Sequence, residues 1–254
     1  MKKLLFLLPL LAIISCAKNE ARILNNGCIE CIGYNSGESF IINGVSYVVA
    51  DRQMIEDAIS NGDDLTRYCT SLITDMSQLF HQKTLFNQDI SSWDVSNVVA
   101  MDQMFLYASS FNQNIGNWDM SKVKYTGGMF DNASSFNQDI GNWDMSKVRS
   151  MDAMFNDAVS FNQDIGIWNV SRSVSMRNMF KNASSFNQDI GNWDMSNVKH
   201  TLGFSGLISM FEGALSFNHD LSDWCVIEDT IIPEDFSTNS ALTASNHPVW
   251  GTCP

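Results

Sequence analysis

An eleven-residue phrase, Phe-Asn-Gln-Asp-Ile-Gly-Asn-Trp-Asp-Met-Ser, recurs almost unchanged along the chain and limits what it can fold into. Five copies stand 25 residues apart, marked by Phe86, Phe111, Phe136, Phe161 and Phe186 and by Trp93, Trp118, Trp143, Trp168 and Trp193. A sixth copy, at Phe217 and Trp224, follows after 31 residues, and the six extra residues lie within Leu202–Ser209. A short fixed period predicts stacked units that bury their apolar sides against one another.

The pattern inside one unit, residues 111–135, predicts its secondary structure. Ile115, Trp118 and Met120 have the apolar-x-x-apolar-x-apolar spacing of leucine-rich repeats, which is typical of a short strand. Apolar residues then recur in steps of three and four, at Val123, Met129, Phe130 and Ala133, and methionine at the place of Thr126 in other copies completes the series. This predicts a helical turn or two. The predicted fold class is therefore α/β, a leucine-rich-repeat-like solenoid of about six 25-residue coils with amino- and carboxy-terminal caps.

Two sets of side chains recur in phase and are predicted to be structural. The phenylalanines, tryptophans and methionines are expected to stack on their equivalents in adjacent coils and to form the core. The asparagines of the phrase are expected to form a hydrogen-bonded ladder from coil to coil, at Asn112, Asn137, Asn162 and Asn187.

The units resemble the BspA-like surface-protein repeats, a leucine-rich-repeat relative of bacterial surface lipoproteins. The matching words, Met-Phe-x-x-Ala-x-Ser-Phe-Asn-Gln-Asp-Ile-x-x-Trp-Asp-Met/Val-Ser-x-Val, stand at Met104–Val123, Met129–Val148 and Met179–Val198. Met154–Val174 departs from them at Asn169 and at its valine, which falls one place late. The resemblance covers roughly residues 70–226. It implies a surface lipoprotein with a repeat-built binding face, and some members of the family are thought to attach to host matrix or to other cells.

The first residues, MKKLLFLLPLLAIISC, have the layout of a bacterial export signal. Two lysines precede an apolar run that is too short to span a bilayer and that ends at Cys16. The ending resembles a lipobox, which implies a lipoprotein signal peptide over residues 1–15 and acyl chains on Cys16. We expect a lipidated tether over residues 16–40 and a location in the bacterial cell envelope, at the outer membrane or cell surface. A plain signal peptide is the alternative.

Export to an oxidising compartment favours disulfides for the five remaining cysteines. Cys225 and Cys253 bracket the last segment and are predicted to pair. Cys69 is predicted to pair with Cys31 or with Cys28, and the sequence leaves this choice open. Zinc is the alternative, because Cys28 and Cys31 have knuckle spacing and Cys69 and His81 would complete four ligands.

The repeats, assigned to residues 70–226, need caps, which we place at residues 41–69 and 227–254. Apolar alternation around Asn43-Gly44 predicts a hairpin, and residues 51–60 predict an amphipathic helix that Asn61-Gly62 ends. At the other end, Phe236, Leu242 and Trp250 are expected to cover the last coil.

No catalytic constellation is recognisable, so we expect a protein that is not an enzyme. The histidines fall at different phases of the repeat, and the chain has no phosphate-binding loop or metalloprotease helix signature. The formal net charge of −13 argues against nucleic acid as a partner. No cofactor is expected, although calcium on the recurrent aspartates is an alternative to turn capping and solvation.

The predicted function is binding or adhesion by a monomeric surface lipoprotein, whose ligand would be an extracellular protein or glycan. One candidate site is an acidic stripe on the strands, formed by Asp94, Asp119, Asp144 and Asp194, with Asn169 in the fourth coil. The other is the insertion, whose apolar residues are Leu202, Phe204, Leu207 and Ile208. The alternative function is a structural spacer without a ligand. Variation from coil to coil separates the two, because a binding face should differ between coils and a spacer should be uniform. The variable sites are few, such as Tyr125, Arg149, Arg177 and Lys199 together with the insertion Leu202–Ser209, and this near-uniformity keeps the spacer as the alternative.

Overall fold

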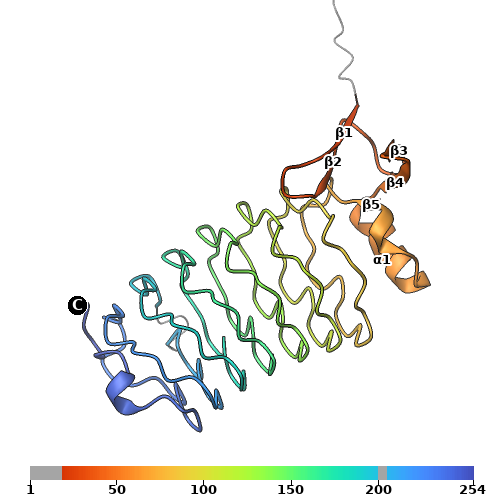
Figure 1. Ribbon diagram of the computed structural model, residues 1–254. Coiled ribbons are helices and arrows are strands. Elements are labelled where there is room, and N and C mark those ends of the chain that lie inside the picture. The colour runs from red at the N-terminus through yellow and green to blue at the C-terminus, as the bar shows by residue number, and fades with distance from the viewer. Residues whose placement is uncertain (1–18, 200–204) are drawn as a thin grey trace, which may run out of the picture.

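The computed structural model describes residues 19–199 and 205–254. A small module of strands and one helix lies at the amino-terminal end, beside the first repeat (Figure 1). The repeats then lie side by side in chain order, from yellow through green to blue, and the carboxy terminus lies by the last of them (Figure 1). We call residues 70–226 the repeat stack.

Two small sheets and one helix make up the amino-terminal module. Strand β1 (Glu20–Ile23) pairs antiparallel with β2 (Ile29–Ile32). Strand β3 (Ser39–Ile42) pairs antiparallel with β4 (Val45–Val49), which pairs parallel with β5 (Tyr68–Cys69). The hairpin predicted around Asn43-Gly44 is confirmed, and both turn residues have positive φ. Residues 16–40 were expected to form a tether, but the described part of this range, 19–40, contains β1, β2 and the start of β3.

The predicted amphipathic helix is also confirmed, as α1 (Arg52–Asn61). Asp51 Oδ1 accepts a hydrogen bond from the Met54 backbone N–H at 3.0 Å, which caps the helix start. Gly62 ends the helix in the left-handed conformation. Ile55 and Ala58 are buried on the face that packs into the core. A short 3-10 helix, η1 (Leu65–Arg67), leads from there to β5.

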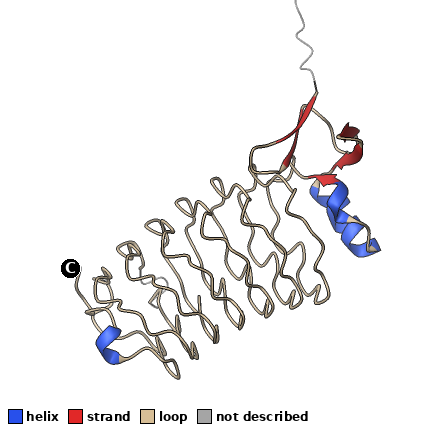
Figure 2. Cartoon of the chain, viewed as in Figure 1, coloured by secondary structure: helices blue, strands red, loops and turns tan. Residues whose placement is uncertain are grey.

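The α/β solenoid predicted for the repeats is wrong. Between β5 and the 3-10 helix η2 (Ala244–Asn246), the described residues contain only turns, irregular segments and isolated bridges. Figure 2 shows the same contrast, with tan loops throughout the stack and colour confined to its ends. Ile115, Trp118 and Met120 are buried without forming a strand, and Val123–Ala133 forms turns rather than a helix.

Backbone hydrogen bonding explains why no helix forms. In a helix every N–H would bond within its own segment. Here alternate N–H groups bond to the next repeat instead: those of Met76, Gln78, Phe80 and Gln82 donate to the carbonyls of Ala100, Asp102, Met104 and Leu106 at 2.7–2.9 Å. The intervening N–H groups close short turns within the repeat. Gln78 and Gln82 have φ values of 62° and 60°, and their counterparts in later repeats are left-handed too, which a helix does not allow.

Between neighbouring repeats, β pairing in the described part of the stack is limited to a single parallel bridge. It joins Asp75, Ala100, Tyr125, Ser150 and Ser175 in succession. Repeats that meet so closely leave no room for a side chain at the glycines of the phrase. A Cβ on Gly141 would stand 2.6 Å from the Asp164 carbonyl oxygen of the next repeat. These glycines therefore allow neighbouring repeats to approach closely.

The predicted aromatic core is confirmed. One column of stacked rings runs through Phe80, Phe105, Phe130, Phe155, Phe180 and Phe211, with centroids 5.3–5.8 Å apart. A second column runs through Phe86, Phe111, Phe136, Phe161, Phe186 and Phe217 at 5.7–6.0 Å. From Trp118 to Trp224, each tryptophan of the phrase also donates its indole N–H to the preceding repeat, as Trp143 does to the Ile115 carbonyl at 3.1 Å. These contacts bury the core without regular secondary structure.

The predicted asparagine ladder is confirmed as well. Oδ1 of Asn112 accepts the backbone N–H of Asn137 at 2.9 Å and the side-chain amide of Gln138 at 2.9 Å. The same pair of bonds is formed by Asn87 in the preceding repeat and by Asn137 and Asn162 in the two following repeats. In each case the donors are the asparagine and the glutamine of the repeat that comes next in the chain. In each repeat, the bond to the asparagine N–H satisfies a backbone donor that no strand partner reaches.

The carboxy-terminal segment covers the last repeat as predicted. Phe236 packs edge-on against Phe211, closing the first aromatic column, and Leu242 and Trp250 pack against the same core. The predicted Cys225–Cys253 disulfide is present. It fixes the end of the chain to the last turn of the stack.

One buried hydroxyl marks a defect in the stack, and its removal should stabilise the protein. Ser173 stands where other repeats have Val123, Val148 and Val198, and its fully buried Oγ has no hydrogen-bond partner. Ser173→Val should raise the free energy of unfolding by about 1–2 kcal/mol, measured by urea denaturation. The reciprocal change Val148→Ser is the control and should lower it. Two changes of the same sign would contradict this account.

Removal of a whole repeat should be tolerated. Deletion of residues 136–160 brings Asn162 to the place of Asn137, so both aromatic columns and the ladder rejoin. We expect a shorter protein with one cooperative thermal transition by circular dichroism. Deletion of residues 136–147 alone would shift the following chain by half a period, so that residues of the turns would lie beside the phrase of the preceding repeat. This loss of register should abolish the transition. Indistinguishable melts would disprove register-dependent stacking.

Candidate binding surface

Repeat-to-repeat differences gather on one wall of the stack. The repeats are aligned by their own hydrogen bonds: the N–H of Arg149 donates to the Lys124 carbonyl at 3.0 Å, and that of Val174 donates to the Arg149 carbonyl at 2.8 Å. Aligned in this way, the repeats are nearly uniform over the phrase, apart from changes such as Ile167, and many of their differences fall in two adjoining segments. We call these segments the variable face: residues 99–103, 124–128, 149–153, 174–178 and 206–209, with 106–107, 131–132, 156–157, 181–182 and 212–213.

The variable face mixes aromatic, charged and small side chains. Tyr107 and Tyr125 are 47% and 40% exposed, and the matching positions of the next repeat carry Asn132 and Ser150. Lys181 pairs with Glu212 at 2.7 Å across neighbouring repeats. Such a wall presents different chemistry at each repeat while the backbone beneath it stays the same.

The predicted acidic stripe is incomplete. Asp119, Asp144 and Asp194 are exposed, as is Asn169. In each, Oδ1 accepts the backbone N–H of the serine two residues later, at 3.0–3.2 Å. Turn capping, one of the roles expected for these residues, is therefore confirmed. The calcium alternative gains no support, since the part of the chain that the structure describes holds no group of three or more potential ligands.

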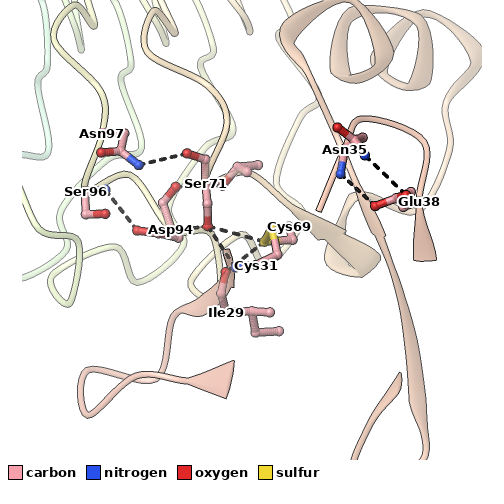
Figure 3. The surroundings of a disulfide bond; sticks show 10 residues. Ile29, Cys31, Asn35, Glu38, Cys69, Ser71, Asp94, Ser96 and Asn97 are labelled. Carbon is pink, nitrogen blue, oxygen red and sulfur yellow. Dashed lines mark hydrogen bonds between the residues drawn. A yellow bond between two sulfur atoms is a disulfide. The ribbon is translucent and has the colours of Figure 1, made fainter. Parts of the chain in front are cut away.

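Asp94 does not belong to the exposed stripe, because it is only 2% exposed. The Ser71 hydroxyl donates to Asp94 Oδ2 at 2.5 Å, and the Ser96 N–H donates to Oδ1 at 3.0 Å. Ser71 Oγ in turn accepts the backbone N–H of Cys31, which links Asp94 to the disulfide region (Figure 3). The amino-terminal module thus covers this carboxylate, a contact that the repeat pattern alone could not reveal.

The pKa values of Asp144 on the acidic stripe and Asp131 on the variable face are shifted in opposite directions. Hydrogen bonds from Ser146 and the nearby Lys147 lower the pKa of Asp144. By contrast, burial raises the pKa of Asp131 on the variable face, and the charge of Asp157 adds to this rise. Asp131 Oδ1 accepts the side-chain amides of Asn132 and Asn156 at 2.7 and 2.8 Å, which offset part of that effect.

The insertion site is only partly supported. Leu202 and Phe204 lie outside the described residues. Leu207 is fully buried, so its expected role as an exposed anchor is wrong. The reason is register: the Met176 N–H donates to the Gly206 carbonyl at 2.8 Å, which places Leu207 where the other repeats bury Met151 or Met176. Ile208 is half-buried on the variable face, at the place of Arg177.

The amino-terminal cysteines form one disulfide and one buried thiol. Cys31 is bonded to Cys69, which settles the choice that the sequence leaves open and removes both from a zinc site (Figure 3). Cys28 is free, and burial raises its pKa to about 12, with smaller effects from Asp94 and Asp119. Its thiol donates weakly toward the Ser91 carbonyl at 3.7 Å. A thiol held neutral in this way is a core residue rather than a nucleophile.

A cavity of about 400 Å³ lies between the end of α1 and the first repeat. Its apolar lining includes Ile59, Leu65, Leu85 and Phe86. Leu85 is 87% exposed, and serine takes its place in the following repeats. The cavity marks the end of the second aromatic column, where no earlier repeat supplies a ring to pack on Phe86.

Comparison with known sequences assigns a family. The profile of the family described as "Mycoplasma protein of unknown function, DUF285" matches residues 51–159 and, a second time, residues 137–250. The chain belongs to the DUF285 family. The two DUF285 matches run from α1 to the last cap, so they cover both the variable face and the uniform phrase. No curated protein and no solved structure matches the chain.

The DUF285 assignment leaves the predicted BspA-like resemblance untested. Among residues 19–199 and 205–254, no helix is long and apolar enough to cross a membrane. Cys16, the predicted lipidation site, falls outside these ranges.

Two carboxylates should respond to neutralisation with opposite signs. Asp131→Asn should raise the melting temperature at pH 7 by about 2 °C, because folding disfavours the Asp131 charge. The gain should fade as the pH falls through the raised pKa. Asp144→Asn should lower the melting temperature at pH 7 by a similar amount, and that loss should fade only as the pH falls through the lowered pKa.

Thermal melts of both variants and of the unaltered protein between pH 3 and pH 7 test this contrast. Shifts of equal sign at pH 7 would show that capping and burial do not distinguish these carboxylates.

Proposed function

We propose that this DUF285 protein is a binding module of the bacterial cell envelope, anchored by acyl chains on Cys16 and engaging an extracellular protein or glycan through the variable face. The observation that carries this proposal is the concentration of repeat-to-repeat differences on a single wall. A spacer needs only the stack itself, whose aromatic columns and asparagine ladder are already uniform. Nothing in the packing requires Tyr125 where the next repeat has Ser150.

The scaffold suits recognition physically. Every repeat is bonded to its neighbours through the backbone, so the side chains on the wall are held at fixed spacing. A partner that binds them loses little ordering entropy in the protein. The exposed rings of Tyr107 and Tyr125 supply the kind of amphipathic anchor that dominates binding energy at interfaces.

The binding role can be tested with the protein's own alternative residues. Tyr107→Asn and Tyr125→Ser introduce the residues of the next repeat, so the fold should be unaffected. We expect the double variant to lose roughly tenfold or more in affinity for whichever extracellular-matrix protein or glycan the full chain binds on an immobilised panel.

The control is Asn142→Ile, which copies Ile167 into an exposed position of the uniform phrase. It should bind as the unaltered chain does. A full chain that binds no probe, or a double variant that binds as tightly as the control, would favour the spacer function instead.

The anchor requires a separate experiment. In the cell, Cys16→Ala should move the protein out of the membrane fraction and abolish its labelling by a palmitate analogue, because the thiol is the proposed acylation site. Cys28→Ala is the matched control and should leave both unchanged. A Cys16→Ala protein that stays in the membrane fraction would exclude this anchor.

A further inference from the structure

Positive charge on this acidic protein is concentrated along one line of the stack. Six lysine and arginine residues occupy two alternate positions of the repeats, just before and at the start of the variable face. We call them the basic strip: Lys122, Lys124, Lys147, Arg149, Arg172 and Lys199.

The geometry of the strip follows from the backbone. Lys122 and Lys124 flank the buried Val123, and Lys147 and Arg149 flank the buried Val148, so each pair faces outward. The hydrogen bonds that run from residue 99 through 124, 149 and 174 to 199 place successive repeats one backbone rung apart. At about 4.8 Å per rung, the cations of adjacent repeats are close neighbours.

Among the described residues, no cation of the strip lies within 4.0 Å of a carboxylate oxygen, although Lys147 is close enough to Asp144 to lower the pKa of that carboxyl. Elsewhere, Arg22, Arg52, Arg67 and Lys181 each lie within 4.0 Å of a carboxylate. On the strip, Lys122 Nζ donates to the amide oxygen of Asn97, at 2.7 Å. Like charges on neighbouring rungs repel each other. In a chain with 28 acidic and 15 basic residues, this is not a shortage of carboxylates.

We propose that the basic strip binds a linear anionic polysaccharide, laid along the stack axis with its carboxylate or sulfate groups against successive repeats. The inference rests on the proposed binding function and names the class of its partner. Each anionic group would relieve the repulsion between adjacent cations, and Arg149 and Arg172 can hold such a group with two hydrogen bonds.

The surroundings of the strip select for a narrow ligand. The exposed Asp119 and Asp144 form an acidic row three residues before Lys122 and Lys147. Asp102 and Asp152 form another, three residues after Val99 and Arg149. A flat anionic membrane would meet these acidic rows together with the strip, whereas a single polymer chain can lie between them. Single-stranded nucleic acid stacks successive bases on exposed aromatic rings, whereas the exposed Tyr125 beside the strip is followed in the next two repeats by Ser150 and Ser175.

The test measures binding of heparin and hyaluronate oligosaccharides to the full chain by calorimetry at 50 and 150 mM salt. We expect binding at 50 mM, weakening at 150 mM, and a loss of at least about tenfold in the triple variant Lys122→Gln, Lys147→Gln, Arg172→Gln. The control is Arg22→Gln, Arg67→Gln, Lys83→Gln, which removes the same charge away from the strip and should bind as the unaltered chain does. Thermal melts establish that both variants are folded.

Several outcomes would overturn the proposal: no binding of either polysaccharide at 50 mM salt, equal losses in the two triple variants, or equally strong strip-dependent binding of phosphatidylglycerol vesicles or oligo-deoxythymidine. None of these touches the proposed function, which is decided by the Tyr107 and Tyr125 variants. Conversely, polysaccharide binding that depends on the strip but not on those tyrosines would support the inference while removing the wider variable face from recognition.

Discussion

Hydrogen bonds between the backbones of successive repeats determine the rest of this structure. In the segment from Met76 to Gln82 and its counterparts, alternate N–H groups donate to carbonyls of the next repeat. Neighbouring repeats must therefore stay in register and close together. That register sets phenylalanine on phenylalanine in two columns and brings each tryptophan N–H to a carbonyl of the preceding repeat. It also obliges residues such as Gln78 and Gln82 to adopt left-handed conformations, which the close inter-repeat bonding compensates.

The sequence predicts what depends on periodicity and fails where the backbone pattern decides. The period, the buried aromatic residues and the ladder at Asn112 follow from recurrence, and α1 follows from Asp51, its apolar face and Gly62. The helix predicted over residues 123–133 is wrong because steps of three and four also arise from successive turns. Asn132, Asp157 and Asn182, residue types that tolerate positive φ, are the local signal that could have identified those turns.

The candidate sites show the same division. Turn capping by Asp119 and Asp144 could be predicted, since aspartate two residues before a serine is a common capping arrangement. The burial of Asp94 depends on the amino-terminal module, which contacts it through Ser71 and lies far from it in sequence and outside the repeats. Leu207 was mistaken for an exposed anchor because its place is decided by where the inserted residues end, and only the bond from Met176 to Gly206 shows this.

The bond from Met176 to Gly206 has a consequence for how the length of the chain can vary between repeats. The N–H of Lys199 still donates to the Val174 carbonyl at 3.1 Å, and Gly206 resumes the pattern on the other side, so the core is the same before and after the extra residues. This corner therefore accepts a change in chain length without cost to the aromatic columns. Lineages of such repeats can acquire new loops here one insertion at a time, so surface novelty and core stability can evolve independently.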